Sequence, residues 1–156
     1  QFKLPKDFVA DAPQNRWWLI GQWHDQPNRA LGESWEGFPA RSPPVSLGIG
    51  EVNGKIGMGL TCGPTKSGQK QRLAGHVFLE RNKWHKILVK IRWSEKADGH
   101  ISVFLDNALE PVLSDSGSNM NNAFRHYLRF GMYRHKDIST DNWIFLKDLR
   151  ITDCAR

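Results

Sequence analysis

Gln22 and His24 stand two residues apart in the segment Arg-Trp-Trp-Leu-Ile-Gly-Gln-Trp-His-Asp, residues 16–25. A neutral amide can hydrogen-bond a carboxylate, and an imidazole is the side chain best suited to take a proton near neutral pH. Because side chains alternate along a strand, both groups would face the same side. The pair is therefore suited to remove a proton beside a bound carboxylate.

A second polar face is expected in residues 127–134, Tyr-Leu-Arg-Phe-Gly-Met-Tyr-Arg. Alternation turns Leu128, Phe130 and Met132 inward and Tyr127, Arg129, Gly131 and Tyr133 outward. Tyr133 could protonate a departing oxygen or, beside Arg129 or Arg134, act as the base. The glycine at 131 would leave room for a ligand against the backbone.

Arg134 and three more residues would bind substrate and complete a cationic, aromatic groove if these strands share one sheet. Lys90 and Arg92 lie opposite the apolar side of a strand over residues 86–93. Strict alternation also places Trp18 on the face of Gln22 and His24.

Together these groups fit the β-elimination of a uronate-containing polysaccharide. Gln22 would bind the carboxylate and stabilise the enolate-like intermediate. His24 and Tyr133 would divide the base and acid roles, and the sequence leaves their order open. Each proton transfer of this kind contributes ~100- to 10,000-fold in rate. The chemistry requires no cofactor.

Other functions are less well supported. Glycoside hydrolysis usually needs two carboxylates about 5–10 Å apart, and these polar faces carry none. No Gly-x-Ser-x-Gly motif indicates a nucleophilic triad. The net charge of +6 attracts anions, but the basic residues are scattered, which favours an acidic polysaccharide over nucleic acid. No apolar run is long enough to span a membrane. We also expect the protein to be a monomer.

The elements that must position these groups are short strands. We expect one all-β domain over residues 1–156, with about eight strands arranged as a sandwich. Hairpin turns are predicted at Asn53-Gly54 and Asp98-Gly99, and Gly57 and Gly59 would leave one strand face bare. We expect one strand that ends near residue 4. Further strands are expected over residues 17–24, 45–49, 56–61, 76–79, 86–93, 100–106, 127–134 and 143–151. Loops are expected at residues 25–44, 63–71 and 111–122.

The two cysteines, Cys62 and Cys154, match no metal-ligand spacing. They would form one disulfide or remain two free thiols, and we favour free thiols.

Two motifs resemble those of a known family. Gly21-Gln22-Trp23-His24 resembles the Gln-x-His motif of jelly-roll polysaccharide lyases, and residues 127–134 resemble their Tyr-Phe-Lys-x-Gly-x-Tyr motif. Segments 83–94 and 98–106 are similar to the middle of the heparin lyase I and glucuronan lyase group.

The resemblance implies a concanavalin-like β-jelly roll of two curved antiparallel sheets. It implies a secreted or periplasmic lyase that holds glucuronan, alginate or a heparin-like polymer in its concave groove. Gln22 would neutralise the carboxylate, His24 and Tyr133 would transfer protons, and Tyr127 and Arg129 would bind substrate. Some family members carry a structural calcium, which this sequence does not place.

The sequence departs from the family pattern at one point, and one alternative function also fits it. The Arg-x-Glu-x-Arg motif of the alginate lyase branch does not appear, and only fifteen residues precede Arg16, which leaves open whether N-terminal strands are lacking. The alternative is a non-catalytic carbohydrate-binding module that uses Trp18, Trp35 and Tyr127 as stacking platforms.

Overall fold

The computed structural model describes residues 1–10, 16–38, 40–65 and 70–153, and these residues fold as the expected all-β structure. None of the described residues belongs to a helix long and apolar enough to cross a membrane. A single 3-10 turn, η1, covers Arg29–Leu31 within the described ranges. The strands are β1 (Phe2–Lys3), β2 (Trp18–His24), β3 (Val45–Val52), β4 (Lys55–Cys62), β5 (Arg72–Phe78), β6 (Trp84–His85), β7 (Ile87–Arg92), β8 (His100–Leu105), β9 (Leu113–Ser116), β10 (Tyr127–Arg134) and β11 (Phe145–Leu146).

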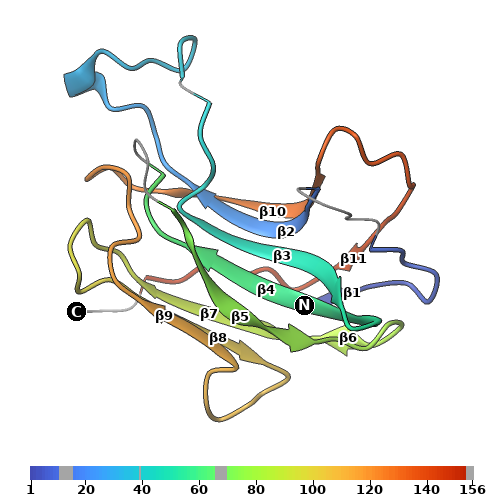
Figure 1. Cartoon of the computed structure of the whole chain (residues 1–156). Coiled ribbons are helices and arrows are strands. Elements are labelled where there is room, and N and C mark those ends of the chain that lie inside the picture. Colours follow the sequence, from blue (N-terminus) through green and yellow to red (C-terminus); the bar gives the residue numbers. More distant parts are fainter. Residues whose placement is uncertain (11–15, 39, 66–69, 154–156) are drawn as a thin grey trace.

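The strands form antiparallel sheets that enclose one core. A five-stranded sheet has the order β10-β2-β3-β4-β5, and three-stranded sheets have the orders β7-β8-β9 and β11-β1-β6. Figure 1 shows the five-stranded sheet above β7, β8 and β9, as in a jelly roll. The core between them is built from side chains such as Leu47, Met58, Leu60, Ile101 and Val103.

The β3–β4 hairpin shows how the sequence builds the central sheet. Its strands alternate large apolar residues with Gly, Ser or Thr, so the apolar side chains reach the core and the small ones face outward. At the turn, Asn53 and Gly54 have φ values of 52° and 74°. Positive φ at both positions is the requirement of the tight turn that Asn-Gly predicts.

Three strand predictions differ from the structure. β9 lies inside the predicted loop 111–122, where Asp115 holds the largely polar strand to Arg72 of β5 by an ion pair of 2.6 Å. The strand predicted over residues 143–151 is limited to β11, because its partner β1 has only two residues. β5 also begins earlier than the predicted residue 76.

Cys62 is a buried free thiol, in agreement with the favoured alternative for that residue. Cys154 lies outside the described residues.

A bulge in β2 corrects the predicted faces of the first motif. Leu19 pairs with Gly48 and Gly21 with Leu47, so Ile20 is one extra residue between two consecutive pairs. Trp18 and Ile20 are each 1% exposed in the core. The prediction that Trp18 shares the outward face of Gln22 is therefore wrong, because the bulge reverses the alternation between them.

Candidate active site on the open face of the five-stranded sheet

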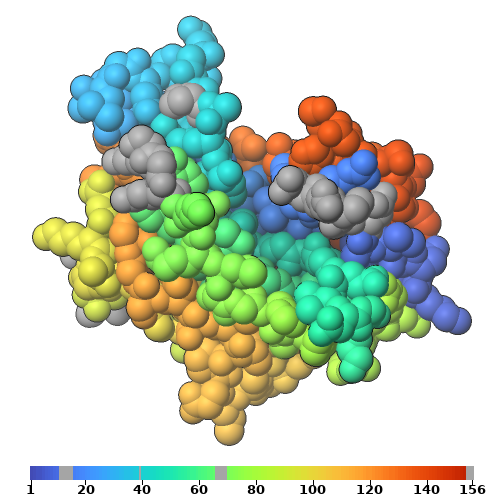
Figure 2. All heavy atoms as spheres, viewed as in Figure 1, coloured from blue at the N-terminus to red at the C-terminus, as the bar shows by residue number. Residues whose placement is uncertain are grey.

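The side of the five-stranded sheet that points away from the core carries most of the predicted site residues. We call it the open face. Antiparallel partners point to the same side, so the register defines this face. In Figure 2 it lies in a hollow bordered by residues 25–38 and 40–44, in blue to cyan, and residues 135–144, in orange-red. One row of paired residues across neighbouring strands of this face is Arg129, Gln22, Ser46 and Thr61. A second row is Tyr133, Leu19, Gly48 and Gly59.

A shallow pocket of about 160 Å³ lies where β2 meets β10, and Gln22, Arg129 and Tyr133 all line it. Gln22 is 4% exposed, whereas Tyr133 is 53% exposed. The ring of Tyr133 packs against Trp17 at a centroid distance of 4.8 Å. An amide, a guanidinium and a phenol thus share one small recess.

Arg129 and Tyr127 form a pair next to this pocket. The Arg129 Nη2 group donates a hydrogen bond of 3.2 Å to the Tyr127 hydroxyl, and the guanidinium lies 5.3 Å from the ring centroid. This contact keeps the positive charge of Arg129 on the open face.

His24 lies behind Tyr127, not in the pocket. The two rings stack with their centroids 5.8 Å apart, and the His24 side chain is 11% exposed. Tyr133 pairs with Leu19, five positions from His24 along β2, which corresponds to roughly 15 Å between Cα atoms. The fold therefore brings Tyr133 to Gln22, but it does not bring His24 to Tyr133.

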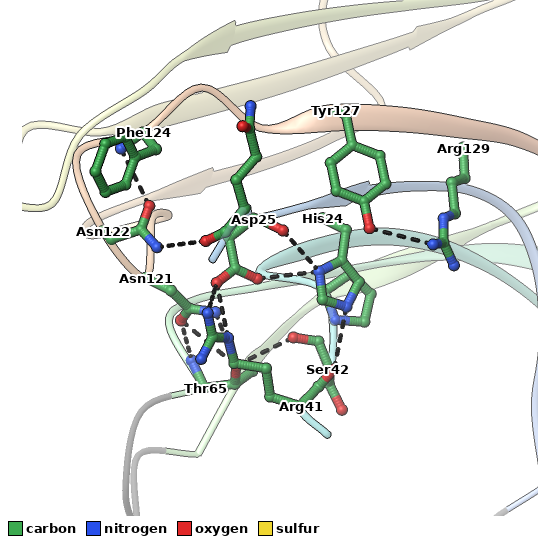
Figure 3. Close-up of polar contacts among 12 residues, drawn as sticks. His24, Asp25, Arg41, Ser42, Thr65, Asn121, Asn122, Phe124, Tyr127 and Arg129 are labelled. Carbon is green, nitrogen blue, oxygen red and sulfur yellow. Dashed lines mark hydrogen bonds and ion pairs between the residues drawn. The ribbon is translucent and has the colours of Figure 1, made fainter. Parts of the chain in front are cut away.

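Both ring nitrogens of His24 face hydrogen-bond acceptors, as Figure 3 shows. Nδ1 is 3.0 Å from a carboxylate oxygen of Asp25, and Nε2 is 3.2 Å from the carbonyl oxygen of Arg41. A neutral imidazole has one N–H and can satisfy one acceptor, whereas the doubly protonated ring satisfies both. Both nitrogens are thus engaged within the protein, and a substrate could reach either one only by displacing Asp25 or Arg41.

Asp25 connects His24 to the long loop. Its carboxylate is fully buried and accepts a hydrogen bond of 2.7 Å from Arg41 Nε. Burial alone would raise its pKa, but the hydrogen bonds from His24 and Arg41 outweigh that effect and lower the pKa to about 2. Arg41 also donates to both carboxylate oxygens of Glu33, at 2.8 and 3.0 Å. These contacts hold Glu33 and Arg41 of the loop to the end of β2.

Sequence reasoning did not find this network. Asp25 directly follows the Gln-x-His motif, which was the available clue. Its partners Arg41 and Glu33 lie in a loop without periodicity, so no pattern indicated that they meet.

Three predicted substrate-binding residues lie elsewhere. Lys90 and Arg92 belong to β7, in the separate β7-β8-β9 sheet, and Arg92 forms an ion pair of 2.8 Å with Asp98. Arg134 pairs with Trp18 on the core side of β10, lies 5.8 Å from its ring centroid and donates to the Thr140 carbonyl. The prediction that one groove gathers all three with Gln22 is wrong, because alternation defines faces along a strand but not which sheet the strand joins.

Over the described ranges, no group of three or more His, Cys, Asp or Glu side chains is arranged to hold a metal ion. The structural calcium that the resemblance left open is therefore assigned to no residue.

A family model described as polysaccharide lyase matches residues 1–150. No curated protein and no solved structure matches the chain.

Proposed function

The chain belongs to the polysaccharide lyase family, and from that membership we propose that it cleaves a uronate-containing polysaccharide by β-elimination in the pocket between β2 and β10. The observation that carries this proposal is the presence of Gln22, Arg129 and Tyr133 around one recess of the open face. Glucuronan, alginate and heparin-like polymers are the candidate substrates.

The proposed role of Gln22 and Arg129 is to bind the uronate carboxylate. Removing the proton from the carbon next to this carboxylate places negative charge on the carboxylate oxygens. The Gln22 amide and the Arg129 guanidinium can donate hydrogen bonds to those oxygens as the charge grows. The low exposure of Gln22 strengthens this effect, since water competes less in a buried site.

Tyr133 is the proposed proton-transfer group. It lines the same pocket, and its exposed ring is held by Trp17. Its phenolate would take the proton beside the carboxylate, the glycosidic carbon–oxygen bond would break, and the phenol would return a proton to the departing oxygen. The product is a chain end with a carbon–carbon double bond.

We propose that His24 is not the base, although a histidine side chain is well suited to that role. Its nitrogens are held by Asp25 and Arg41, and its ring supports Tyr127. We assign it to positioning Tyr127 and the 25–44 loop. Its participation as base would require the loop to release Nε2 first.

The test follows ultraviolet absorbance of the new double bond with glucuronan, alginate and heparin. Tyr133→Phe should reduce the rate ~100- to 10,000-fold, because it removes the proton carrier and keeps the ring. His24→Gln retains hydrogen-bonding groups and should lower the rate less. Equal activity of wild type and Tyr133→Phe would contradict the assignment of Tyr133.

A second candidate is a non-catalytic carbohydrate-binding module. Trp35 favours it, since this residue is 56% exposed, stacks on Phe38 and contacts the Tyr127 ring at 5.8 Å. Trp18 cannot serve as a platform, because it is buried. Binding of these polymers without any double-bond absorbance, together with loss of binding in Trp35→Ala, would support the module.

A further inference from the structure

The open face continues beyond the pocket as a strip of bare backbone. Gly48 pairs with Gly59, and Gly50 pairs with Gly57, so four glycines of β3 and β4 lie side by side. We call these residues the glycine strip. A Cβ atom added at Gly50 would meet no atom within 4 Å, and one at Gly48 would make only ordinary contacts. These two positions therefore have space for a side chain that the sequence does not place there.

Aromatic and basic side chains border the far edge of the strip. His76 pairs with Gly59 and Phe78 with Gly57, so both residues of β5 share the open face. Their rings are in contact, with centroids 5.3 Å apart, and Phe78 is 48% exposed. Lys55 lies two residues before Gly57 on the same face, with its Nζ atom 5.5 Å from the Phe78 centroid.

This arrangement resembles the chemistry of the pocket at the opposite edge of the sheet. Each edge offers an exposed aromatic ring and a positive charge, and bare backbone lies between them. From β10 to β5 there are four strand spacings, or roughly 19 Å along the sheet. That length accommodates several consecutive sugar rings of an extended polymer.

We propose that Lys55, His76 and Phe78 form a distal subsite, which binds an acidic sugar unit of the same polymer several units away from the bond that is cleaved. This proposal rests on the proposed function. The Phe78 ring packs against the apolar face of the sugar, and the Lys55 ammonium pairs with its carboxylate. The glycine strip lets the intervening units lie against the sheet.

The test measures binding in a Tyr133→Phe background, so that cleavage does not consume the ligand. The probes are glucuronan, alginate and heparin, each as intact polymer and as disaccharide. Lys55→Ala combined with Phe78→Ala should weaken binding of the intact polymer about tenfold. Binding of the disaccharide at the pocket should not change. Gly50→Val, which places a branched side chain on the strip, should also weaken polymer binding.

The matched control is Lys3→Ala combined with Phe145→Ala. Phe145 is 43% exposed beneath the Lys3 ammonium at 4.7 Å, but both residues lie in the β11-β1-β6 sheet. This control should leave polymer binding unchanged. Equal polymer affinity with and without Lys55 and Phe78 would overturn the distal subsite. If the Lys55 and Phe78 substitutions weaken polymer binding but the wild type forms no double bond, the subsite is retained and the lyase proposal fails.

Discussion

Asp25 is the residue whose environment makes the clearest prediction about stability. Its pKa is lowered from 3.8 to about 2 in the fold, so the folded state binds its proton less tightly than the unfolded chain does. The resulting stabilisation is present above pH 4 or so and is lost as the pH falls towards about 2. It corresponds to roughly 2 kcal/mol in the free energy of unfolding.

Denaturation by urea at pH values from about 5 to about 2 should therefore show a smaller loss of stability in Asp25→Asn than in the wild type. The Glu33→Gln variant is a useful comparison, since the pKa of Glu33 is also lowered to about 2 by Arg41. Its side chain is 18% exposed, so we expect it to change the pH dependence less. Identical pH dependence in wild type and Asp25→Asn would contradict the role of the buried carboxylate.

Cys62 gives a second prediction that concerns a single residue. Burial raises the pKa of its thiol to about 12, and the thiolate is the reactive form. In a Cys154→Ser variant, iodoacetamide should modify the folded protein roughly a thousandfold more slowly than the unfolded protein. Mass spectrometry of timed samples measures both rates. Modification at the unfolded rate would mean that Cys62 is accessible.

The site residues also show what alternation along a strand can and cannot predict. The spacing of Gln22 and His24 correctly predicted that both leave the core side of β2. It could not predict that Asp25 and Arg41 would hold the nitrogens of His24, because Arg41 reaches them from a loop without periodicity. The location of Tyr133 beside Gln22 depends on pairing between strands more than 100 residues apart, which one strand's pattern does not contain.

The irregular pairing of β10 with β2 positions Tyr133. The register shifts between Phe130 and Tyr133, and Gly131 within this shift has a φ of 145°. L-residues with a Cβ rarely adopt that conformation. A Cβ atom at 131 would meet nothing within 4 Å, so a substitution there tests backbone conformation without steric overlap.

Gly131→Ala should reduce the free energy of unfolding by about 1–2 kcal/mol and should lower the rate of double-bond formation as Tyr133 shifts. Gly50→Ala is the control for stability, because Gly50 also has open space around it but no positive φ. Its stability should stay within about 0.5 kcal/mol of the wild type. Urea denaturation of both variants measures the difference, and equal stability would show that the shift does not depend on glycine.

Strand predictions succeeded where apolar and polar residues alternate clearly and failed at short, largely polar or bulged strands. β3, β4, β7 and β8 carry clear alternation, and their paired hairpins agree with it. β9 was missed because an ion pair between Asp115 and Arg72 supports it. The alternation of apolar and polar residues cannot predict such a pair between two strands. The bulge at Ile20 was missed because it depends on the partner strand β3.

The whole molecule carries a net charge of +6, and its basic residues would attract the proposed anionic polymer over different distances. Arg129 lies on the open face, whereas Arg92 lies on another sheet and is paired with Asp98. Exposed charges interact over about 30 Å at 10 mM salt but only about 8 Å at physiological ionic strength. The two arginines should therefore respond differently to salt.

At low salt, both Arg129→Ala and Arg92→Ala should slow association with glucuronan, alginate or heparin, because each removes one unit of the attracting charge. At physiological ionic strength, Arg92→Ala should bind as the wild type does, since screening removes its long-range contribution. Arg129→Ala should still bind about tenfold more weakly, because the proposed contact between Arg129 and the carboxylate is direct. Surface plasmon resonance across a salt series separates the two effects. A loss of affinity in Arg92→Ala that persists at high salt would mean that the polymer also contacts the β7-β8-β9 sheet.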